Sequence, residues 1–559
     1  MLQLPASPQW HAAPPSGWKT RKVVLLFIAL IAIASLILLS QNDVTTAVSN
    51  VSVTTSSIFK TDSCKGWDPH AAEELDPPEC FRAQQFRQIA QFTATPEYAA
   101  LKDVGQLRAI NRITNCALGV TACPERPLIV SDYEFIYNPE HKAGVAHGEE
   151  VWVSSLVEGI RQMGYEMLIF NKDENRTWNY TRLLDKSIHM YFTDANHAFR
   201  CFHNPHCVRP EDYVRPATHA IEEPPAALRG VLPAWRIFGL SFWGARPNKY
   251  NAIFLDTAKH WGINGDDGHE EWSHHVLGTK WQIVPFAYPG HTDIPMTIEQ
   301  ACLQTPVVPL HEREDGILIL GKHAPYLRGG IIKGIHPAWD DIVRAMKREG
   351  VDFWLTAKPD PKMPFPEGMV SLGWQAPAEY RRKAGSAKAM LGIGMPSISP
   401  SPYEALCAGV PVVLPKNGNH SASGWEMFEP TWFQHGPLQA LGTPYVYSYD
   451  GSDPQDLVEQ LTKAVNTPYV YSYDGSDPQD LVEQLTKAVN TPIEPFIPPD
   501  MTTKAVFARV KEVIEHDWEA EYHAVRAANG GRNPGYKPIQ WEKCWERGVC
   551  DPAVLSHRP

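Results

Sequence analysis

The stretch from Met390 to Pro415 holds the residues whose types and spacing best support chemistry. It reads MLGIGMPSISPSPYEALCAGVPVVLP, which predicts a buried strand, a Gly/Pro/Ser loop, a short helix carrying Glu404, and a second strand. Gly392 and Gly394 would let the backbone approach a ligand, and a helix starting at Pro402 would present N–H groups to phosphate. A carboxylate at Glu404 can reach a ribose hydroxyl, so the stretch predicts a nucleotide site.

Two lysines are candidates for an ionic contact with a diphosphate in that site. Lys322 follows the strand predicted at residues 316–321, and Lys416 follows the strand predicted at 410–414. The alternative is that either is simply an exposed lysine. The chain contains no Asp-x-Asp triplet, so the prediction is that donor binding uses no metal and no cofactor. Basic side chains and a helix dipole would then offset the charge of a leaving diphosphate.

Strands and helices alternate on both sides of the chain's midpoint. The first series has strands at 127–131, 166–170, 188–193 and 252–255, with a helix at 150–163. The second has strands at 316–321, 352–356, 388–392 and 410–414, with helices at 337–349 and 378–384. Strand, helix and strand in this order predict parallel sheets. The expected fold is α/β, with two facing Rossmann-like doubly wound domains that bind ligands at the carboxyl ends of their strands.

An apolar run from Val23 to Leu39, preceded by Lys19, Arg21 and Lys22, predicts a membrane anchor with a cytosolic N-terminus. A cleaved signal peptide is the alternative. The expected organisation is a cytoplasmic tail (1–22), a transmembrane helix (23–40) and a stem with a disulfide-tied helical segment (41–125). An N-terminal Rossmann-like domain (126–310), a C-terminal one (311–503) and a helical, Cys-containing tail (504–559) follow.

The cysteines and the charge limit the compartment and the partners. A net charge of −12 without a long basic run argues against nucleic-acid binding. Ten cysteines in a luminal chain predict disulfides, and the close pairs are Cys64 with Cys80, Cys116 with Cys123, Cys201 with Cys207, and Cys544 with Cys550. Cys407 lies inside the apolar helix of the first motif and is expected to be a buried thiol.

Residues 443–466 are repeated without a substitution at 467–490. Repeat architectures need three or more units, and their copies normally differ. Two identical copies therefore indicate a recent duplication or an error in the gene model. Each copy predicts one aromatic strand and one helix, and we expect one copy to pack in the second domain while the other is a surface excursion.

The segment GIGMPSISPSPYEALCAGVPVVLPK and the downstream segments PYVYSYD and DLVEQLTKAVNTPIEPFIPPDMT resemble glycosyltransferase family 18, the N-acetylglucosaminyltransferase V-like family. The likeness is weak over residues 126–510 and strong over 390–416 and 480–503. In that family the glutamate that matches Glu404 contacts the UDP part of the donor. The alternative is that Glu404 only stabilises the start of its helix.

The segment HGEEVWVSSLVEGIRQMGY, from His147 to Tyr165, also resembles the family. There a glutamate directly after a glycine is the catalytic base, which points to Glu149, with Glu150 as its competitor. An inverting transfer needs a carboxylate that takes the proton of the acceptor hydroxyl as it attacks the anomeric carbon. Charge compensation at a helix start is the structural alternative.

The resemblance implies an inverting transfer of N-acetylglucosamine from UDP-GlcNAc to O6 of an α-mannose on N-glycans. The apolar run and its basic flank predict a single-pass type II membrane protein with a luminal catalytic domain, which we expect in the Golgi, and homo-oligomer formation is left open. Pro396 stands where retaining enzymes often carry a second glutamate, which favours inversion. Ile398 replaces a family acidic residue, and no lysine lies between Lys416 and Lys463, so donor contacts must differ in detail. Another donor such as GDP-mannose, or an inactive glycan-binding scaffold, stays as the alternative.

Overall fold

The computed structural model describes residues 78–101, 103–141, 148–214, 223–242, 271–272, 275–287, 290–328, 330–357, 360–418, 433–466, 493–534 and 538–539. Contacts divide the chain into two units, residues 1–100 and 101–559. In the first unit, the described part is helix α2 (Pro78–Thr93) and the short helix α3 (Pro96–Ala99). Thr95 caps α3, because its hydroxyl accepts the Tyr98 N–H.

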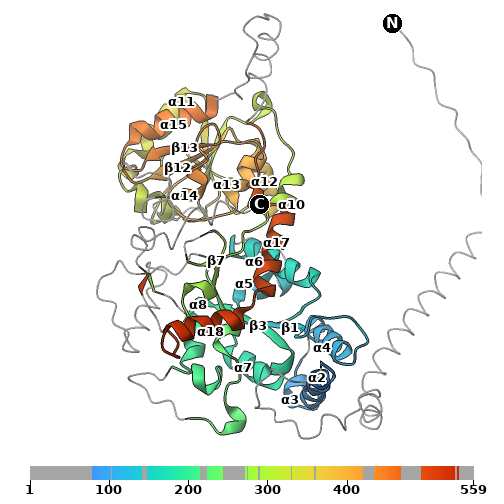
Figure 1. Cartoon of the computed structure of the whole chain (residues 1–559). Coiled ribbons are helices and arrows are strands. Elements are labelled where there is room, and N and C mark those ends of the chain that lie inside the picture. The colour runs from blue at the N-terminus through green and yellow to red at the C-terminus, as the bar shows by residue number, and fades with distance from the viewer. Residues whose placement is uncertain are drawn as a thin grey trace, which may run out of the picture. The chain divides into compact units, whose positions relative to one another are not determined.

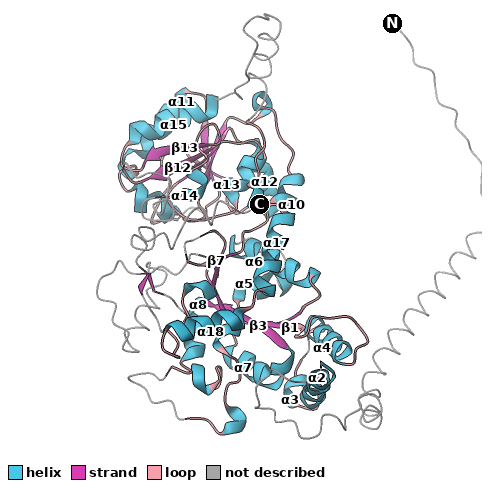
Figure 2. Ribbon diagram, in the orientation of Figure 1, coloured by secondary structure: helices cyan, strands magenta, loops and turns pink. Residues whose placement is uncertain are grey.

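The second unit contains two six-stranded sheets in which all strands run parallel, so the predicted α/β class is confirmed (Figure 2). The first sheet has the order β2-β1-β3-β4-β6-β7. Its strands are β1 (Leu128–Ser131), β2 (Glu166–Ile169), β3 (Ile188–Asp194), β4 (Ile237–Leu240), β6 (Gln282–Val284) and β7 (Thr292–Asp293). Strands β4, β6 and β7 are missing from the sequence-based prediction, and the strand predicted at 252–255 lies outside the described residues.

The helices of the first sheet come from both ends of the second unit. They are α4 (Val104–Ala117), α5 (Glu134–His141), α6 (Gly148–Gln162), α7 (Glu174–Leu183), α8 (Ala195–Phe202), α10 (Glu299–Leu303), α17 (Thr503–Glu515) and α18 (Trp518–Ala528). Helix α17 packs on α6 so closely that a Cβ at Gly159 would lie 3.0 Å from Val510. Arg509 also donates to the Asp293 carbonyl at 2.8 Å. The C-terminal helices therefore pack beside elements of the first sheet.

The second sheet has the order β10-β9-β8-β11-β12-β13. Its strands are β8 (Gly316–Leu320), β9 (Asp352–Leu355), β10 (Val370–Ser371), β11 (Ala389–Gly392), β12 (Val412–Lys416) and β13 (Val446–Asp450). Its helices are α11 (Trp339–Arg348), α12 (Pro377–Ser386), α13 (Ser401–Cys407), α14 (Gly436–Gln439) and α15 (Pro454–Asn466). Figure 1 shows α11 and α15 on one side of β12 and β13, with α13 and α14 on the other. A two-stranded antiparallel ribbon joins β5 (Glu271–Trp272) to β14 (Pro538–Ile539).

Helix α11 shows why these segments form where they do. Asp340 and Asp341 lie in its first turn and Lys347 and Arg348 in its last, which matches the helix dipole. Its buried face repeats at helical spacing and packs into the core of the second sheet; it consists of Trp339, Ile342, Val343 and Met346.

The first copy of the duplicated segment forms β13 and α15, the strand at one end of the second sheet and a helix that covers it. Tyr449, Leu457 and Leu461 from this copy are fully buried in the core of that sheet. The second copy, residues 467–490, lies outside the described residues. The first copy is therefore an integral part of the second sheet and its core.

Three disulfides are described. Cys116–Cys123 and Cys201–Cys207 confirm two of the predicted pairs. The prediction of a free thiol at Cys407 is wrong, because Cys407 forms a disulfide with Cys302 in α10. The sequence suggested pairing by short spacing, whereas this bond joins residues 105 positions apart. Cys80 is also disulfide-bonded, while Cys64, Cys544 and Cys550 lie outside the described residues.

No helix within the described ranges is long and apolar enough to cross a membrane. The anchor predicted at residues 23–40 lies outside those ranges.

Candidate functional site

The loop between β11 and α13 is held in shape by one side chain that the sequence-based prediction does not include, Gln434. Gly394 adopts a positive φ of 83°, which favours glycine, and its N–H donates to Gln434 Oε1 at 2.8 Å. Gln434 Nε2 donates in turn to the Pro396 carbonyl at 2.9 Å. The amide therefore clamps the loop at two points.

The side-chain amide of Gln434 also explains why position 392 holds a glycine. A Cβ at Gly392 would lie 2.3 Å from Gln434 Oε1 and 2.6 Å from Leu414 Cδ2. The space beside its Cα thus already holds protein side chains. Packing alone accounts for this glycine, and contact between Gly392 and a donor stays a prediction.

The start of α13 offers fewer N–H groups than the sequence suggests. Pro402 has no N–H, and the Ser401 N–H donates to the Ser399 hydroxyl at 3.2 Å. The Glu404 N–H already donates to the Pro400 carbonyl at 3.0 Å. Phosphate binding by this seven-residue helix would therefore need help from side chains.

The carboxylate of Glu404 lies against α12. Arg381 Nη1 is 4.0 Å from Glu404 Oε1, and the Glu404 side chain is 12% exposed. Burial raises the pKa of Glu404 to about 7, although the positive charge of Arg381 lowers it. The negative charge of Glu404 also contributes to a raised pKa of Tyr380, which burial raises first. Glu404 is thus a largely buried carboxyl group that titrates near neutral pH.

The start of α6 meets the loop that precedes α13. A Cβ at Gly148 would lie 3.0 Å from Phe242 Cζ and 3.1 Å from Pro400 Cδ. A second contact joins the segment after β6 to α13, because the rings of Phe286 and Tyr403 stack with centroids 6.1 Å apart. Gly148, the residue before the candidate base, therefore contacts the loop between β11 and α13 (residues 393–400), which is called the donor loop below. Gly148 and Pro400 are some 250 residues apart in the sequence.

Charged groups gather around this contact. Lys322 is an exposed side chain, yet desolvation by the surrounding protein lowers its pKa, while the negative charges of Glu149 and Glu150 act to raise it. Glu149 also acts on the buried Tyr133, whose pKa is raised well above its ordinary value, first by burial and then by Asp194, Glu149 and Glu134. The arrangement thus brings Glu149, Glu150 and Lys322 within electrostatic range of one another.

Glu149 and Glu150 differ in exposure. Glu149 is partly exposed, whereas Glu150 is 3% exposed. A group that exchanges a proton with a bound acceptor must be reachable, so accessibility favours Glu149.

The described charge interaction of Lys416 is with another residue, Asp450, and not with these glutamates. Lys416 ends β12 in register with Asp450 of β13. Burial raises the pKa of Asp450, but hydrogen bonds from Ser452 and Gly418 and the charge of Lys416 outweigh this, so the net shift is downward. The described surroundings of Lys416 therefore tie it to Asp450, and its contact with a donor stays a prediction.

Three participants carry no local signal in the sequence. Gln434, Arg381 and Tyr133 reach the site only through tertiary contacts, and none belongs to a recognisable motif. Within the part of the chain that the structure describes, no group of three or more His, Cys, Asp or Glu residues could hold a metal ion.

No protein family model and no curated protein matches this chain. Among solved structures it is similar to the glycosyltransferase SnogD from Streptomyces nogalater, at 11% identity over 72% of this chain and 98% of that one, with a TM-score of 0.26. It is also similar to a UDP-GlcNAc 2-epimerase from Methanocaldococcus jannaschii, at 10% identity over 64% and 98%, with a TM-score of 0.31. An O-GlcNAc transferase mutant from Thermobaculum terrenum matches at 11% identity over 84% and 79%, with a TM-score of 0.27. TM-scores this low carry no argument about activity.

Proposed function

We propose that this chain is an inverting, metal-independent glycosyltransferase that moves N-acetylglucosamine from UDP-GlcNAc to O6 of an α-mannose on N-glycans of glycoproteins. The observation that supports this most directly is the contact between Gly148 and Pro400. It joins the two segments that resemble family 18, one for the base and one for the donor.

Glu149 is the proposed general base. It is the second residue of α6 and follows the glycine that contacts the donor loop, so its carboxylate would take the proton of the acceptor hydroxyl during attack on the anomeric carbon. Attack from the side opposite the leaving diphosphate inverts the configuration of the anomeric carbon. General base catalysis of this kind contributes roughly 10²- to 10⁴-fold to the rate.

Lys322 is the proposed cation for the departing diphosphate. It follows β8 at the carboxyl end of the second sheet, where ligands of parallel sheets bind. Without donor it faces the field of Glu149 and Glu150, so it would counter negative charge at the centre of the reaction. Glu404, against α12, is the proposed contact for the ribose.

The compartment proposed for the protein is the Golgi lumen, with the chain held as a type II membrane protein by residues 23–40. The disulfides described above support an oxidising compartment, since such bonds are rare in the cytosol.

Two measurements on the purified full chain test the proposal. The first is thermal unfolding with a panel of nucleotide sugars, in which UDP-GlcNAc should raise the midpoint; a ligand at 100 times its Kd stabilises by about 2.7 kcal/mol. The second is transfer of N-acetylglucosamine to a mannose-terminated N-glycan. If GDP-mannose alone stabilises the protein and is turned over, the donor is wrong. If glycan binds but no nucleotide sugar does, the chain is a scaffold and the proposal fails.

A further inference from the structure

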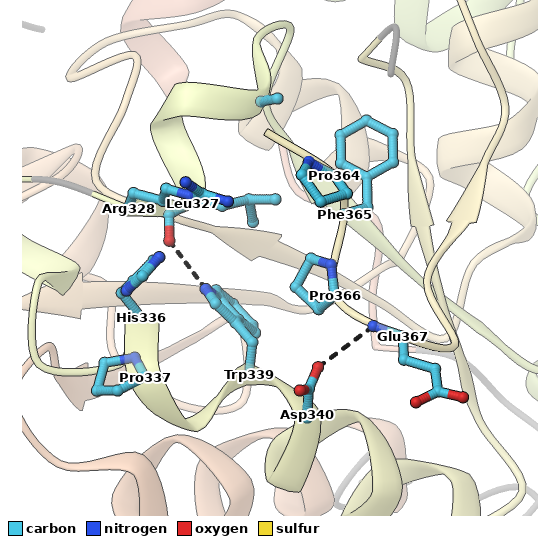
Figure 3. A pocket seen from close by; sticks show the side chains of 11 residues that line it. Leu327, Arg328, His336, Pro337, Trp339, Asp340, Pro364, Phe365, Pro366 and Glu367 are labelled. Carbon is cyan, nitrogen blue, oxygen red and sulfur yellow. Dashed lines mark hydrogen bonds between the residues drawn. The ribbon is translucent and has the colours of Figure 1, made fainter. Parts of the chain in front are cut away.

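One cavity in the second sheet's domain lies outside the site described above. It has a volume of about 270 Å³ and opens between the connection from β8 to α11 and the segment 364–367 that follows β9. Figure 3 shows Arg328 and His336 on one side, Pro366 and Asp340 on the other, and Trp339 between them. Its volume lies just below the range for ligand pockets, roughly 300–1,000 Å³, and suits one small ring.

The floor of the cavity is fixed by the protein's own contacts. Trp339 is 3% exposed, and its indole N–H donates to the Leu327 carbonyl at 2.9 Å. Asp340 Oδ1 accepts the Glu367 N–H at 3.2 Å, which ties the start of α11 to the opposite wall. The two dashed lines in Figure 3 mark these bonds. The cavity is therefore built by contacts between its walls and is more than a gap between loops.

Several polar side chains on its rim keep hydrogen-bonding groups unused within the part of the chain that the structure describes. Among the described residues, the side chains of Arg328, His336 and Glu367 make no hydrogen bond or ion pair, and Asp340 uses only one carboxylate oxygen. They come from separate turns of the chain and face one cavity. Donors and acceptors are thus both available to a ligand.

The mixture of charges selects the class of ligand. Asp340 and Glu367 would repel a phosphate or a carboxylate, and Arg328 would repel a cation. A neutral polyol with hydroxyls that donate and accept suits all of these groups. The remaining walls include Pro364, Phe365 and Pro366, against which the C–H face of a sugar ring can pack.

The cavity is connected to the candidate site by its own chain segment. The connection from β8 to α11 contains Lys322, Arg328 and Ile331. A Cβ at Gly394 would lie 3.7 Å from Ile331, so this connection also touches the donor loop. A ligand of several sugar units could therefore bind in the cavity and in the candidate site at the same time.

We infer that this cavity is an accessory saccharide-binding subsite, which takes a sugar unit of the acceptor glycan remote from the reacting mannose. The inference rests on the proposed function for its choice of glycan. Arg328 and Asp340 hold hydroxyls from opposite walls, and the apolar wall takes the ring face. The subsite would add affinity for extended glycans without touching the reacting atoms.

The test compares glycan binding in the full chain and three variants by calorimetry, with the free pentasaccharide core of N-glycans as probe. Arg328→Ala and Asp340→Asn should each weaken binding about fivefold, the effect of one lost hydrogen bond. Arg348→Ala, an exposed arginine at the other end of α11, is the matched control and should bind like the unaltered chain. All three should stay folded, with unfolding temperatures within a few degrees of the unaltered chain because Asp340 and Arg348 each contribute a little to the dipole of α11. The affinity for methyl α-mannoside should not change.

Unchanged pentasaccharide affinity in both Arg328→Ala and Asp340→Asn overturns the inference. So does Arg328-dependent binding of inorganic phosphate or free glycine without glycan binding. Transfer assays separate this outcome from failure of the proposed function. If transfer is absent but glycan binding depends on Arg328, the subsite stands and the enzyme assignment falls. If transfer occurs and glycan binding is independent of Arg328, only the subsite falls.

Discussion

Gly148 packs tightly against Pro400, since a Cβ on Gly148 would stand 3.1 Å from Pro400 Cδ and the proline would have to give by a few tenths of an ångström. The first residue of α6 and the last residue before α13 therefore set each other's position. Because Glu149 follows Gly148 directly, the distance from the candidate base to the donor loop depends on this contact.

Gly148→Ala should lower kcat/KM for transfer about tenfold or more, because the added methyl must push Pro400 or Phe242 aside and shift Glu149. The cost in stability should be about 1–3 kcal/mol, as for other overpacked sites. The matched control is Gly159→Ala in the same helix, whose Cβ would lie 3.0 Å from Val510, away from the loop. Equal loss of activity per folded molecule in both variants would contradict the role of the Gly148 contact.

Glu149→Gln should reduce kcat by about 10²- to 10⁴-fold with little change in donor affinity, because the amide cannot accept the proton. Glu158→Gln, on an exposed position of the same helix, should keep full activity. Steady-state kinetics with a mannose-terminated glycan measure both. Full activity in Glu149→Gln together with inactive Glu150→Gln would move the base to Glu150.

The pH dependence of stability should carry a contribution from Glu404. Its pKa is raised from 4.5 to about 7 in the folded chain, so the folded state binds more protons than the unfolded state between these values. The contribution favours folding at low pH and is lost as the pH rises through about 7. Over pH 5.5 to 8.5 the chain should lose about 2 kcal/mol relative to Glu404→Gln.

Denaturant unfolding of the unaltered chain and of Glu404→Gln at several pH values measures this difference. Parallel pH profiles for the two proteins would show that the carboxyl ionises normally.

Gln434→Ala should weaken donor binding and destabilise the protein by about 2–4 kcal/mol, because the Gly394 N–H and the Pro396 carbonyl lose their partner. Gly392→Ala should also destabilise, since its Cβ would meet Gln434 Oε1. Together they should cost less than the sum of the single changes, because Gln434→Ala removes the closest clash. If the losses of unfolding free energy in the two single variants add up to the loss in the double variant, Gln434 does not hold the loop as described.

The double variant Cys302→Ser, Cys407→Ser should unfold more easily by about 3–5 kcal/mol, the value for a disulfide that closes a loop of roughly 100 residues. The double variant Cys116→Ser, Cys123→Ser is the control, since it removes a bond with a separation of seven residues. The first pair should cost more stability than the second. The reverse order in thermal or denaturant unfolding would contradict this expectation.

The parallel sheets could be predicted from sequence because their strands are continuous apolar runs, such as GILIL in β8, separated by helices with clear ends. Strands β6 and β7 escaped prediction because they are only three and two residues long and lie in irregular sequence. Glu149 and Glu404 carry motif signals, but Gln434 acts on Gly394 from 40 residues away. A contact of that kind depends on the folded chain and leaves no periodic pattern.

The bond between Cys302 and Cys407 also affects how the protein should be prepared. It fastens the end of the donor-loop helix to α10, just before the chain enters the second sheet. Bacterial cytosol or a buffer with strong reductant would yield a chain in which this helix is no longer tethered. Loss of activity under those conditions would reflect the state of the preparation, so expression in a secretory host and assays free of thiols are the appropriate starting point.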